Sequence, residues 1–350
     1  MDTVCTGEAA ERLLFNMNTT EIARFWKWFH QRASSLSSDP GKYGDEISEM
    51  IERLHTGLAW EMGGPNADGK LDFVVRCQNP KARSFCEEIV SRAPDLPGWI
   101  FSAWRPAHNT AGFQIRIADG RTYTADLFTA DIAEVSHWPL LDLVLVSPEF
   151  RKDPTPQDRH AGYLVLDAAL GEKMVEDALD DIQIRSGPPG KFRVSELREV
   201  VYRELALART RSTSGTDRWI SVEGERSGKP MLISLAETLG ADRLANYPWL
   251  LVLSLPMWNP GENGLPTGEE LDRLQVIGDR LIQELTDNAA GLFWGAWSHD
   301  GWRKCAFYMR TSIDLVDRAR SITDQFGERP EIEVKYDSRW RAYRGFLPEG

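Results

Sequence analysis

Short motifs that would identify a chemistry are absent from this sequence of 350 residues. It contains no phosphate-binding loop, no glycine-rich nucleotide fingerprint, no G-x-S-x-G turn and no H-E-x-x-H zinc pair. Without such a motif, a catalytic site would have to be assembled from residues far apart in the chain, and the sequence leaves that alternative open. The histidines available for it are scattered: His30, His55, His108, His137, His160 and His299.

Cysteine is scarce, and its spacing excludes the familiar zinc sites. The four cysteines are Cys5, Cys77, Cys86 and Cys305, and no two of them form a C-x-x-C pair. Cys77 and Cys86 fall within apolar strand and helix patterns, where cysteine packs as a small hydrophobic side chain. We therefore expect structural thiols in a reducing compartment and neither a metal nor another cofactor.

Long apolar runs are also missing. A membrane-spanning helix needs about 18 or more consecutive apolar residues, and the sequence has no such run. Its first eight residues, MDTVCTGE, have neither the basic nor the apolar segment of a secretory signal. These features predict a cytoplasmic protein without a membrane partner.

Positive charge is in deficit. The sequence has 53 acidic and 41 basic residues, which gives a net charge of −12. A phosphate backbone would on average be repelled by such a chain, so nucleic acid is not the expected partner.

Large apolar side chains are plentiful, and their patterns predict an α+β protein of more than one domain. Hydrophobic residues make up 42% of the chain and include 13 Trp and 14 Phe, which is enough to build a sizeable core. The stretch 209–217 has no large apolar residue and is therefore predicted to be a linker. The predicted divisions are an N-terminal tail at 1–18, a mixed α+β region at 19–208 with a possible break near 137, the linker, and a C-terminal domain at 218–350.

The C-terminal domain shows the clearest order of elements. A hairpin at 218–235 is followed by a strand at 248–255, a helix at 267–285, strands at 292–297 and 302–310, a helix after Ser312 and a strand at 331–336. Thr267 and Glu270 have the spacing of a capping box at the start of the first helix. Asp300-Gly301 between two strands is a strong hairpin signal. The order from 246 to 337 is βαββαβ, which predicts a ferredoxin-like domain.

Four short segments of this region form a distinctive set: Tyr247-Pro248-Trp249, Asn263-Gly264-Leu265-Pro266-Thr267, Asp300-Gly301-Trp302-Arg303 and Phe307-Tyr308. They resemble a bacterial domain of unknown function, family 695. The resemblance extends to upstream pieces from about residue 20, and it implies the same βαββαβ architecture. In some members that architecture is followed by a part similar to the B-type regulator of ribonuclease activity, which implies regulation by protein contact. The family brings no catalytic residues.

The first candidate site is one face of the C-terminal sheet. A ferredoxin-like sheet is covered by helices on one face, and alternation along the strand at 302–310 divides its side chains between the two faces. The aromatic and basic set is expected on the uncovered face, where exposed aromatic side chains usually mark an interface. The residues of this predicted binding face are Trp302, Lys304, Tyr308 and Arg310, with Trp294 from the neighbouring strand.

A second candidate is an acidic stripe. Glu172, Glu176 and Asp180 are spaced four apart and would share one face of a helix. Such carboxylates are weak candidates for a divalent cation, because no histidine or second acidic motif accompanies them at ligand spacing. A solvated helix face is the simpler interpretation.

Together these features favour a non-enzymatic regulatory or adaptor protein that acts by binding another protein. The first alternative is a hydrolase or nuclease-like enzyme whose site is assembled from distant residues. A weaker alternative is a binder of single-stranded RNA, since aromatic side chains interleaved with Lys and Arg can stack on bases. The sequence leaves the partner and the oligomeric state open.

Overall fold

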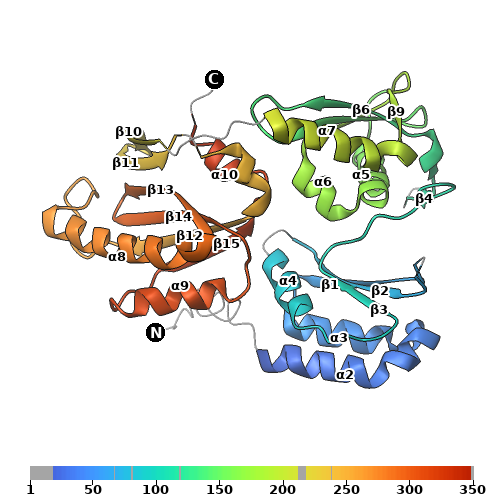
Figure 1. Ribbon diagram of the computed structural model, residues 1–350, viewed down its shortest axis with the longest axis horizontal. Coiled ribbons are helices and arrows are strands. Elements are labelled where there is room, and N and C mark those ends of the chain that lie inside the picture. The colour runs from blue at the N-terminus through green and yellow to red at the C-terminus, as the bar shows by residue number, and fades with distance from the viewer. Residues whose placement is uncertain are drawn as a thin grey trace, which may run out of the picture. The chain divides into compact units, whose positions relative to one another are not determined.

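The structure is a computed structural model that describes residues 19–66, 68–79, 82–117, 120–211, 218–237 and 239–347. The predicted tail at 1–18, which includes Cys5, and most of the predicted linker at 209–217 lie outside these residues. The chain is a mixed α+β protein with several sheets. It divides into two compact units, Met1–Arg105 and Pro106–Gly350 (Figure 1). Residue 137 lies within the second unit.

The first unit is a three-stranded sheet packed against helices. Strand β2 pairs antiparallel with β1 and parallel with β3. Phe29 of the first helix packs edge-on against Phe73 of β2, with ring centroids 4.9 Å apart, and both side chains are buried. The elements are α2 (Thr19–Ser38), η1 (Pro40–Tyr43), α3 (Gly44–Leu54), β1 (Leu58–Gly63), β2 (Leu71–Cys77), α4 (Arg83–Ser91) and β3 (Trp99–Ser102).

The second unit begins with a small hairpin and a four-stranded sheet of order β8-β7-β6-β9. Leu143 and Leu145 of β7, Val165 of α5 and Val201 of α7 belong to one buried apolar cluster, so these helices cover the sheet. The elements are β4 (Gln114–Arg116), β5 (Thr122–Thr124), η3 (Ala125–Leu127), β6 (Thr129–Glu134), β7 (Leu141–Val146), α5 (Pro156–Leu170), α6 (Glu172–Ala178), β8 (Leu179–Arg185), β9 (Phe192–Arg193), η4 (Val194–Glu196) and α7 (Leu197–Arg211).

The same unit continues into a six-stranded antiparallel sheet of order β10-β11-β13-β14-β12-β15. Figure 1 shows α8 and α9 on one side of this sheet and the short helix α10 on the other. The elements are β10 (Trp219–Arg226), β11 (Lys229–Ala236), η5 (Ala241–Asn246), β12 (Trp249–Pro256), α8 (Gly268–Thr286), η6 (Asp287–Ala289), β13 (Gly291–His299), β14 (Trp302–Met309), α9 (Leu315–Asp324), β15 (Glu331–Tyr336) and α10 (Arg341–Arg344).

All six elements predicted between residues 248 and 336 are present within one or a few residues of their expected bounds. The prediction of a capping box at the start of α8 is wrong. The Thr267 hydroxyl donates to the carbonyl of Asn259, and Glu270 accepts from the backbone N–H of Trp258 and from Arg273. These side chains hold the preceding loop instead, because that loop folds back over the first turn of the helix.

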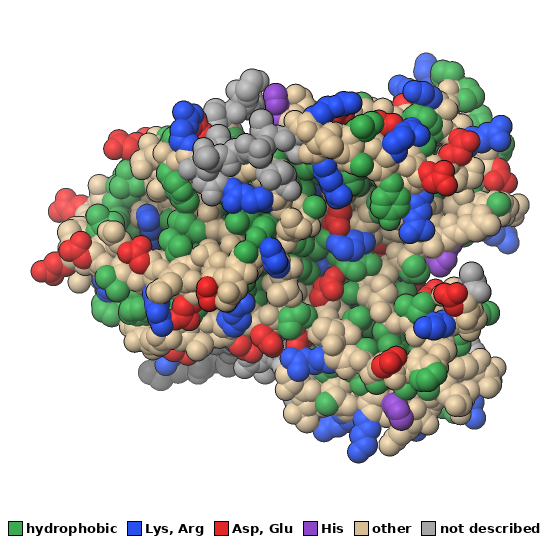
Figure 2. Space-filling model, viewed as in Figure 1, with side chains coloured by type: hydrophobic (Ala, Val, Ile, Leu, Met, Phe, Trp, Pro, Cys, Tyr) green, Lys and Arg blue, Asp and Glu red, His purple; other side chains and the backbone are tan. Residues whose placement is uncertain are grey.

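The surface carries both signs of charge. On the face drawn in Figure 2, basic and acidic side chains are interspersed. Among the described residues, no helix combines the length and apolarity needed to cross a membrane. Cys86 and Cys305 are buried, and burial raises the pKa of the Cys305 thiol, as expected for a structural cysteine.

Candidate functional site

Strand register assigns the aromatic and basic side chains of the C-terminal sheet to one face. Lys304 lies directly opposite Trp297 of β13, and Trp302 lies opposite His299. Directly opposed residues of antiparallel strands point to the same side of the sheet. We call this side the α10 face; on β14 it carries Trp302, Lys304, Ala306 and Tyr308.

Half of the α10 face is covered, which corrects the expectation of an open surface. Tyr308 has no exposed surface and Trp294 is 1% exposed. Trp340 stacks on Tyr308 with ring centroids 4.9 Å apart, while Tyr343 packs edge-on against Trp294 at 5.7 Å. Tyr308 and Trp294 therefore belong to the core and are not available to a partner.

The covering segment is residues 337–347, here called the C-terminal strap. Asp337 holds its first turn by accepting hydrogen bonds from the Tyr308 hydroxyl at 2.7 Å and from the backbone N–H groups of Arg341 and Ala342 at 2.9 and 3.0 Å. Burial and the adjacent Asp337 carboxylate together raise the pKa of Tyr308, so this hydroxyl stays protonated and donates. The strap is thereby fixed to the sheet by polar as well as aromatic contacts.

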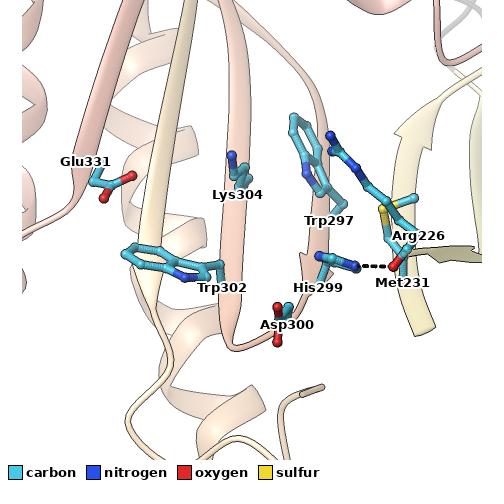
Figure 3. Close-up of a pocket in the computed structure, with 8 residues that line it drawn as sticks. All are labelled: Arg226, Met231, Trp297, His299, Asp300, Trp302, Lys304 and Glu331. Carbon is cyan, nitrogen blue, oxygen red and sulfur yellow. Dashed lines mark hydrogen bonds between the residues drawn. The ribbon is translucent and has the colours of Figure 1, made fainter. Parts of the chain in front are cut away.

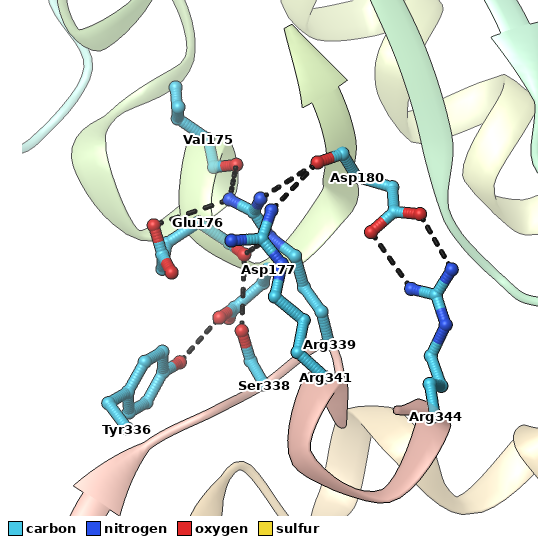
Figure 4. Close-up of polar contacts among 9 residues, drawn as sticks. All are labelled: Val175, Glu176, Asp177, Asp180, Tyr336, Ser338, Arg339, Arg341 and Arg344. Atoms are coloured by element: carbon cyan, nitrogen blue, oxygen red, sulfur yellow. Dashed lines mark hydrogen bonds and ion pairs between the residues drawn. The ribbon is translucent and has the colours of Figure 1, made fainter. Parts of the chain in front are cut away.

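The acidic stripe meets this strap (Figure 4), but it is not one helix face: Glu172 and Glu176 lie on α6, which ends at Ala178, and Asp180 lies on β8. Arg344 donates to both carboxylate oxygens of Asp180 at 2.8 Å, and Arg339 lies 3.3 Å from a carboxylate oxygen of Glu176. Burial alone would raise the pKa of Asp180, but the hydrogen bonds and charge of Arg344 outweigh burial and lower it. Two of the three weak metal candidates are thus paired with arginine. Among the described residues, no group of three or more His, Cys, Asp and Glu side chains is arranged to hold a metal ion.

Arg339 is the most enclosed of the strap arginines. Its side chain is 7% exposed, and its guanidinium donates to the carbonyl oxygens of Val175, Glu176 and Asp180 at 3.2, 2.7 and 3.0 Å. These carbonyls come from the end of α6 and the start of β8, where a helix leaves its last acceptors unpaired. Arg339 therefore caps α6 from the C-terminal domain and joins the two sheets of the second unit.

The other half of the α10 face remains open and forms a hollow of about 340 Å³ at the β13–β14 hairpin (Figure 3). Lys304 stands between the indole rings of Trp297 and Trp302, and the His299 ring donates a hydrogen bond from Nε2 to the Arg226 carbonyl oxygen at 3.0 Å. Every strand of the sheet except β12 contributes to the lining. We call it the β14 hollow; it is lined by Arg226, Met231, Trp297, His299, Asp300, Trp302, Lys304 and Glu331.

The side chains of Lys304 and Arg226 make no hydrogen bond or ion pair with any described residue. Trp297 and Trp302 are half-buried, so each indole offers an apolar surface beside an unneutralised cation. Such a combination can receive an apolar side chain together with a carboxylate. Of the predicted binding residues, Trp302 and Lys304 lie in this hollow.

Arg310, the remaining predicted binding residue, lies outside the β14 hollow. Its guanidinium sits 5.2 Å from the ring centroid of Tyr247 and its backbone N–H donates to the Ala290 carbonyl. It supports the end of the sheet where the strap is attached.

Sequence reasoning missed the strap and six of the eight residues that line the hollow. Trp340, Tyr343 and Phe346 recur every three residues, a spacing that places aromatic side chains on one side of a helical turn and predicts a buried stripe. The alternation of side chains along β13 could have predicted Trp297 and His299 on the same face. Arg226 could not be predicted in this way, because it joins the hollow only through the pairing of the β10–β11 hairpin with β13.

The histidines do not gather around a common site. His30, His108, His137 and His160 are exposed, and His55 is half-buried with its ring stacked on Phe85 at 4.4 Å. His160 lines a separate apolar depression with Ile117 and Leu164.

Residues 217–348 match a family model described as "Family of unknown function (DUF695)". The C-terminal part of the chain is similar to DUF695. The matched residues include β10 through β15 and the strap, so both halves of the α10 face lie within the matched residues. The match supports the resemblance seen in the sequence for this segment; it begins at residue 217, whereas the sequence resemblance was extended to about residue 20. No curated protein and no solved structure matches the chain.

Proposed function

We propose that this chain is a regulatory or adaptor protein that binds another protein through the β14 hollow, without chemistry of its own. The observation that carries the proposal is the pair of half-buried indoles, Trp297 and Trp302, flanking the unpaired ammonium group of Lys304. Tryptophan is enriched among the residues that carry most of the binding energy at protein interfaces, and a cation between indoles that loses its water on binding adds selectivity for an acidic group.

We infer that the domain carrying the hollow is ferredoxin-like. Its strands β15-β12-β14-β13 are neighbours in that order, all antiparallel, and α8 and α9 connect them in the sequence β12-α8-β13-β14-α9-β15. The resemblance to a bacterial family with members similar to the B-type regulator of ribonuclease activity supports a regulatory role by protein contact. As part of this proposal, we place the protein in the cytoplasm.

The chemistry of the hollow describes the partner segment. Lys304 and Arg226 would each receive a carboxylate, while Met231 and the two indoles would bury an apolar side chain. Glu331 borders the hollow on the β15 side and disfavours a second acidic group there. The partner is thus expected to present an apolar side chain next to a single acidic cluster.

The test is quantitative affinity purification from the native host with the full chain carrying Trp302→Ala. Truncating an interface tryptophan typically costs about 2 kcal/mol or more, so recovery of the partner should fall about 30-fold. Trp258→Ala is the matched control, because Trp258 is 59% exposed on the same domain but lies outside the hollow.

Lys304→Glu should abolish binding of the same partner, because it reverses the charge at the centre of the hollow. A partner retained at wild-type level by both Trp302→Ala and Lys304→Glu would refute the assignment of the hollow. Tyr308 is unsuitable for this test, because its truncation would open the core under the strap.

A further inference from the structure

The two edges of the six-stranded sheet differ. At one edge, β15 presents three charged side chains at alternate positions, Glu331, Glu333 and Lys335, a pattern that discourages pairing with another strand. At the other edge, β10 runs for eight residues in regular register with β11 and contains neither proline nor lysine; its charged residues, Glu223, Glu225 and Arg226, lie in the half next to the turn, and its first four residues, Trp219 to Val222, are uncharged. In the described part of the chain β10 pairs only with β11, so one side of its backbone is left without strand partners.

The side chains of β10 are almost all exposed, including large apolar ones. Trp219 is 44% and Val222 43% exposed, and Ile220 is half-buried. Ile220 and Val222 lie opposite Leu235 and Ile233, on the α10 face. An unpaired, regular edge with exposed apolar side chains is a template for strand addition.

We infer that β10 pairs antiparallel with β10 of a second copy of this chain, about a two-fold axis at Val222. The partner copy then continues the sheet, and Val222 lies directly opposite Val222 of the other copy. On either side of the axis, Ile220 is opposite Gly224, Ser221 is opposite Glu223, and Trp219 is opposite Glu225.

The choice of axis follows from the faces and the charges. Directly opposed residues must share a face, so the axis has to pass through a residue and not between two. An axis at Glu223 would set two carboxylates against each other, and an axis at Ser221 would shorten the paired segment. With the axis at Val222, the Glu223 carboxylates meet only diagonally, at about 7 Å in water, where their repulsion is weak.

The backbone of the hairpin agrees with this register. The turn residues Ser227 and Gly228 have φ values of 55° and 76°, as in a type I′ turn, so Arg226 and Lys229 form its closing pair. Hydrogen-bonded pairs then alternate along β10, which directs the N–H and C=O groups of Ser221 and Glu223 outward. These are the residues that face each other across the proposed axis.

A consequence is that the β14 hollows of both copies open on the same side of one continuous sheet, since a two-fold axis perpendicular to a sheet preserves its faces. The dimer itself does not depend on what binds in those hollows.

The register is tested by oxidation of full-length Val222→Cys. Directly opposed residues have Cα atoms about 4.5–5.5 Å apart, within the range of a disulfide, so a cross-linked dimer should form readily. Ile220→Cys is the matched control: the two copies of that residue would be about 13 Å apart, too far to be bridged. Unsubstituted protein under the same oxidant gives the background from native cysteines.

Dimerisation itself is tested by sedimentation velocity over a range of concentrations. The wild-type chain should sediment as a dimer and Val222→Lys as a folded monomer, while Leu232→Lys should remain dimeric. Leu232 is a suitable control because it is 38% exposed on the same hairpin but lies on the inner strand. A monomeric wild type, a dimeric Val222→Lys variant or equal cross-linking of both cysteine variants would each overturn the inference.

Discussion

Asp180 is a residue whose surroundings in the structure differ from those that the sequence predicts. In the sequence it belongs to an acidic stripe, and in the structure it accepts hydrogen bonds from the two terminal guanidinium nitrogens of Arg344, each at 2.8 Å. The helix expected to carry all three carboxylates ends at Ala178, so Asp180 lies on β8 instead, and the arginines that pair with Glu176 and Asp180 lie more than 150 residues away. No local sequence pattern predicts which distant basic residue will pair with a given carboxylate.

A pH-dependent contribution to stability follows from this pair. The pKa of Asp180 is lowered from its usual 3.8 in the folded protein, so folding favours the ionised form. The stabilisation is complete above the unfolded pKa and is lost as pH falls through the lower folded value. The free energy of unfolding of the wild type should therefore exceed that of Asp180→Asn by a constant amount between pH 5 and pH 7, and the difference should shrink below about pH 4.

Urea denaturation at each pH measures this difference. Asp272→Asn, at an exposed position on α8, provides the control and should track the wild type throughout. A difference that persists unchanged into strong acid would mean that Arg344 does not hold the Asp180 carboxylate.

At the scale of elements, the strands of the C-terminal sheet were predictable and the cover on its second face was not. Alternation along β14 divides its side chains between the faces correctly, because period two is fixed by strand geometry. Which half of a face is buried depends on where the chain runs after β15. Contacts with residues far away in the sequence hold the strap in that position, so no local pattern predicts it. The predicted capping box at Thr267 is absent for the same reason: its two side chains form hydrogen bonds with the preceding loop instead.

The strap makes a strong prediction about stability. Trp340 has no exposed surface, stacks on Tyr308 and donates its indole N–H to the Tyr247 carbonyl at 2.9 Å. Trp340→Ala should lower the free energy of unfolding by about 3–5 kcal/mol, as for other buried aromatic truncations. Equilibrium denaturation followed by near-ultraviolet circular dichroism measures the loss.

The exposed Trp258 again supplies the comparison. Trp258→Ala removes only the contact of its ring with Arg273, at 4.0 Å, and should cost less than about 1 kcal/mol. Equal effects of the two substitutions would show that the strap does not pack on the sheet.

At the scale of the molecule, the coupling within the second unit depends on contacts that join residues 106–211 to the C-terminal sheet. Arg339 is the central one, because it satisfies three carbonyl groups while almost fully enclosed. Removing a partner from buried polar groups costs about 1–3 kcal/mol for each group left unpaired. Arg339→Met should therefore split the cooperative unfolding of this unit into two transitions in differential scanning calorimetry.

Arg341→Met tests whether any strap arginine would have the same effect. Arg341 is exposed and donates a single bond to the Asp180 carbonyl, at 2.9 Å, so its loss should leave the unfolding cooperative. A single transition in Arg339→Met would contradict the assigned role of Arg339.

The central claim is that the β14 hollow is the contact surface for a protein partner, and hydroxyl-radical footprinting of the tryptophans tests it most directly. Indole oxidation follows solvent access, so each tryptophan reports on its own surroundings. Adding the co-purified partner should protect Trp302 and Trp297 and leave the oxidation of Trp258 unchanged. Unaltered oxidation of Trp302 and Trp297 in the saturated complex would place the contact elsewhere on the chain.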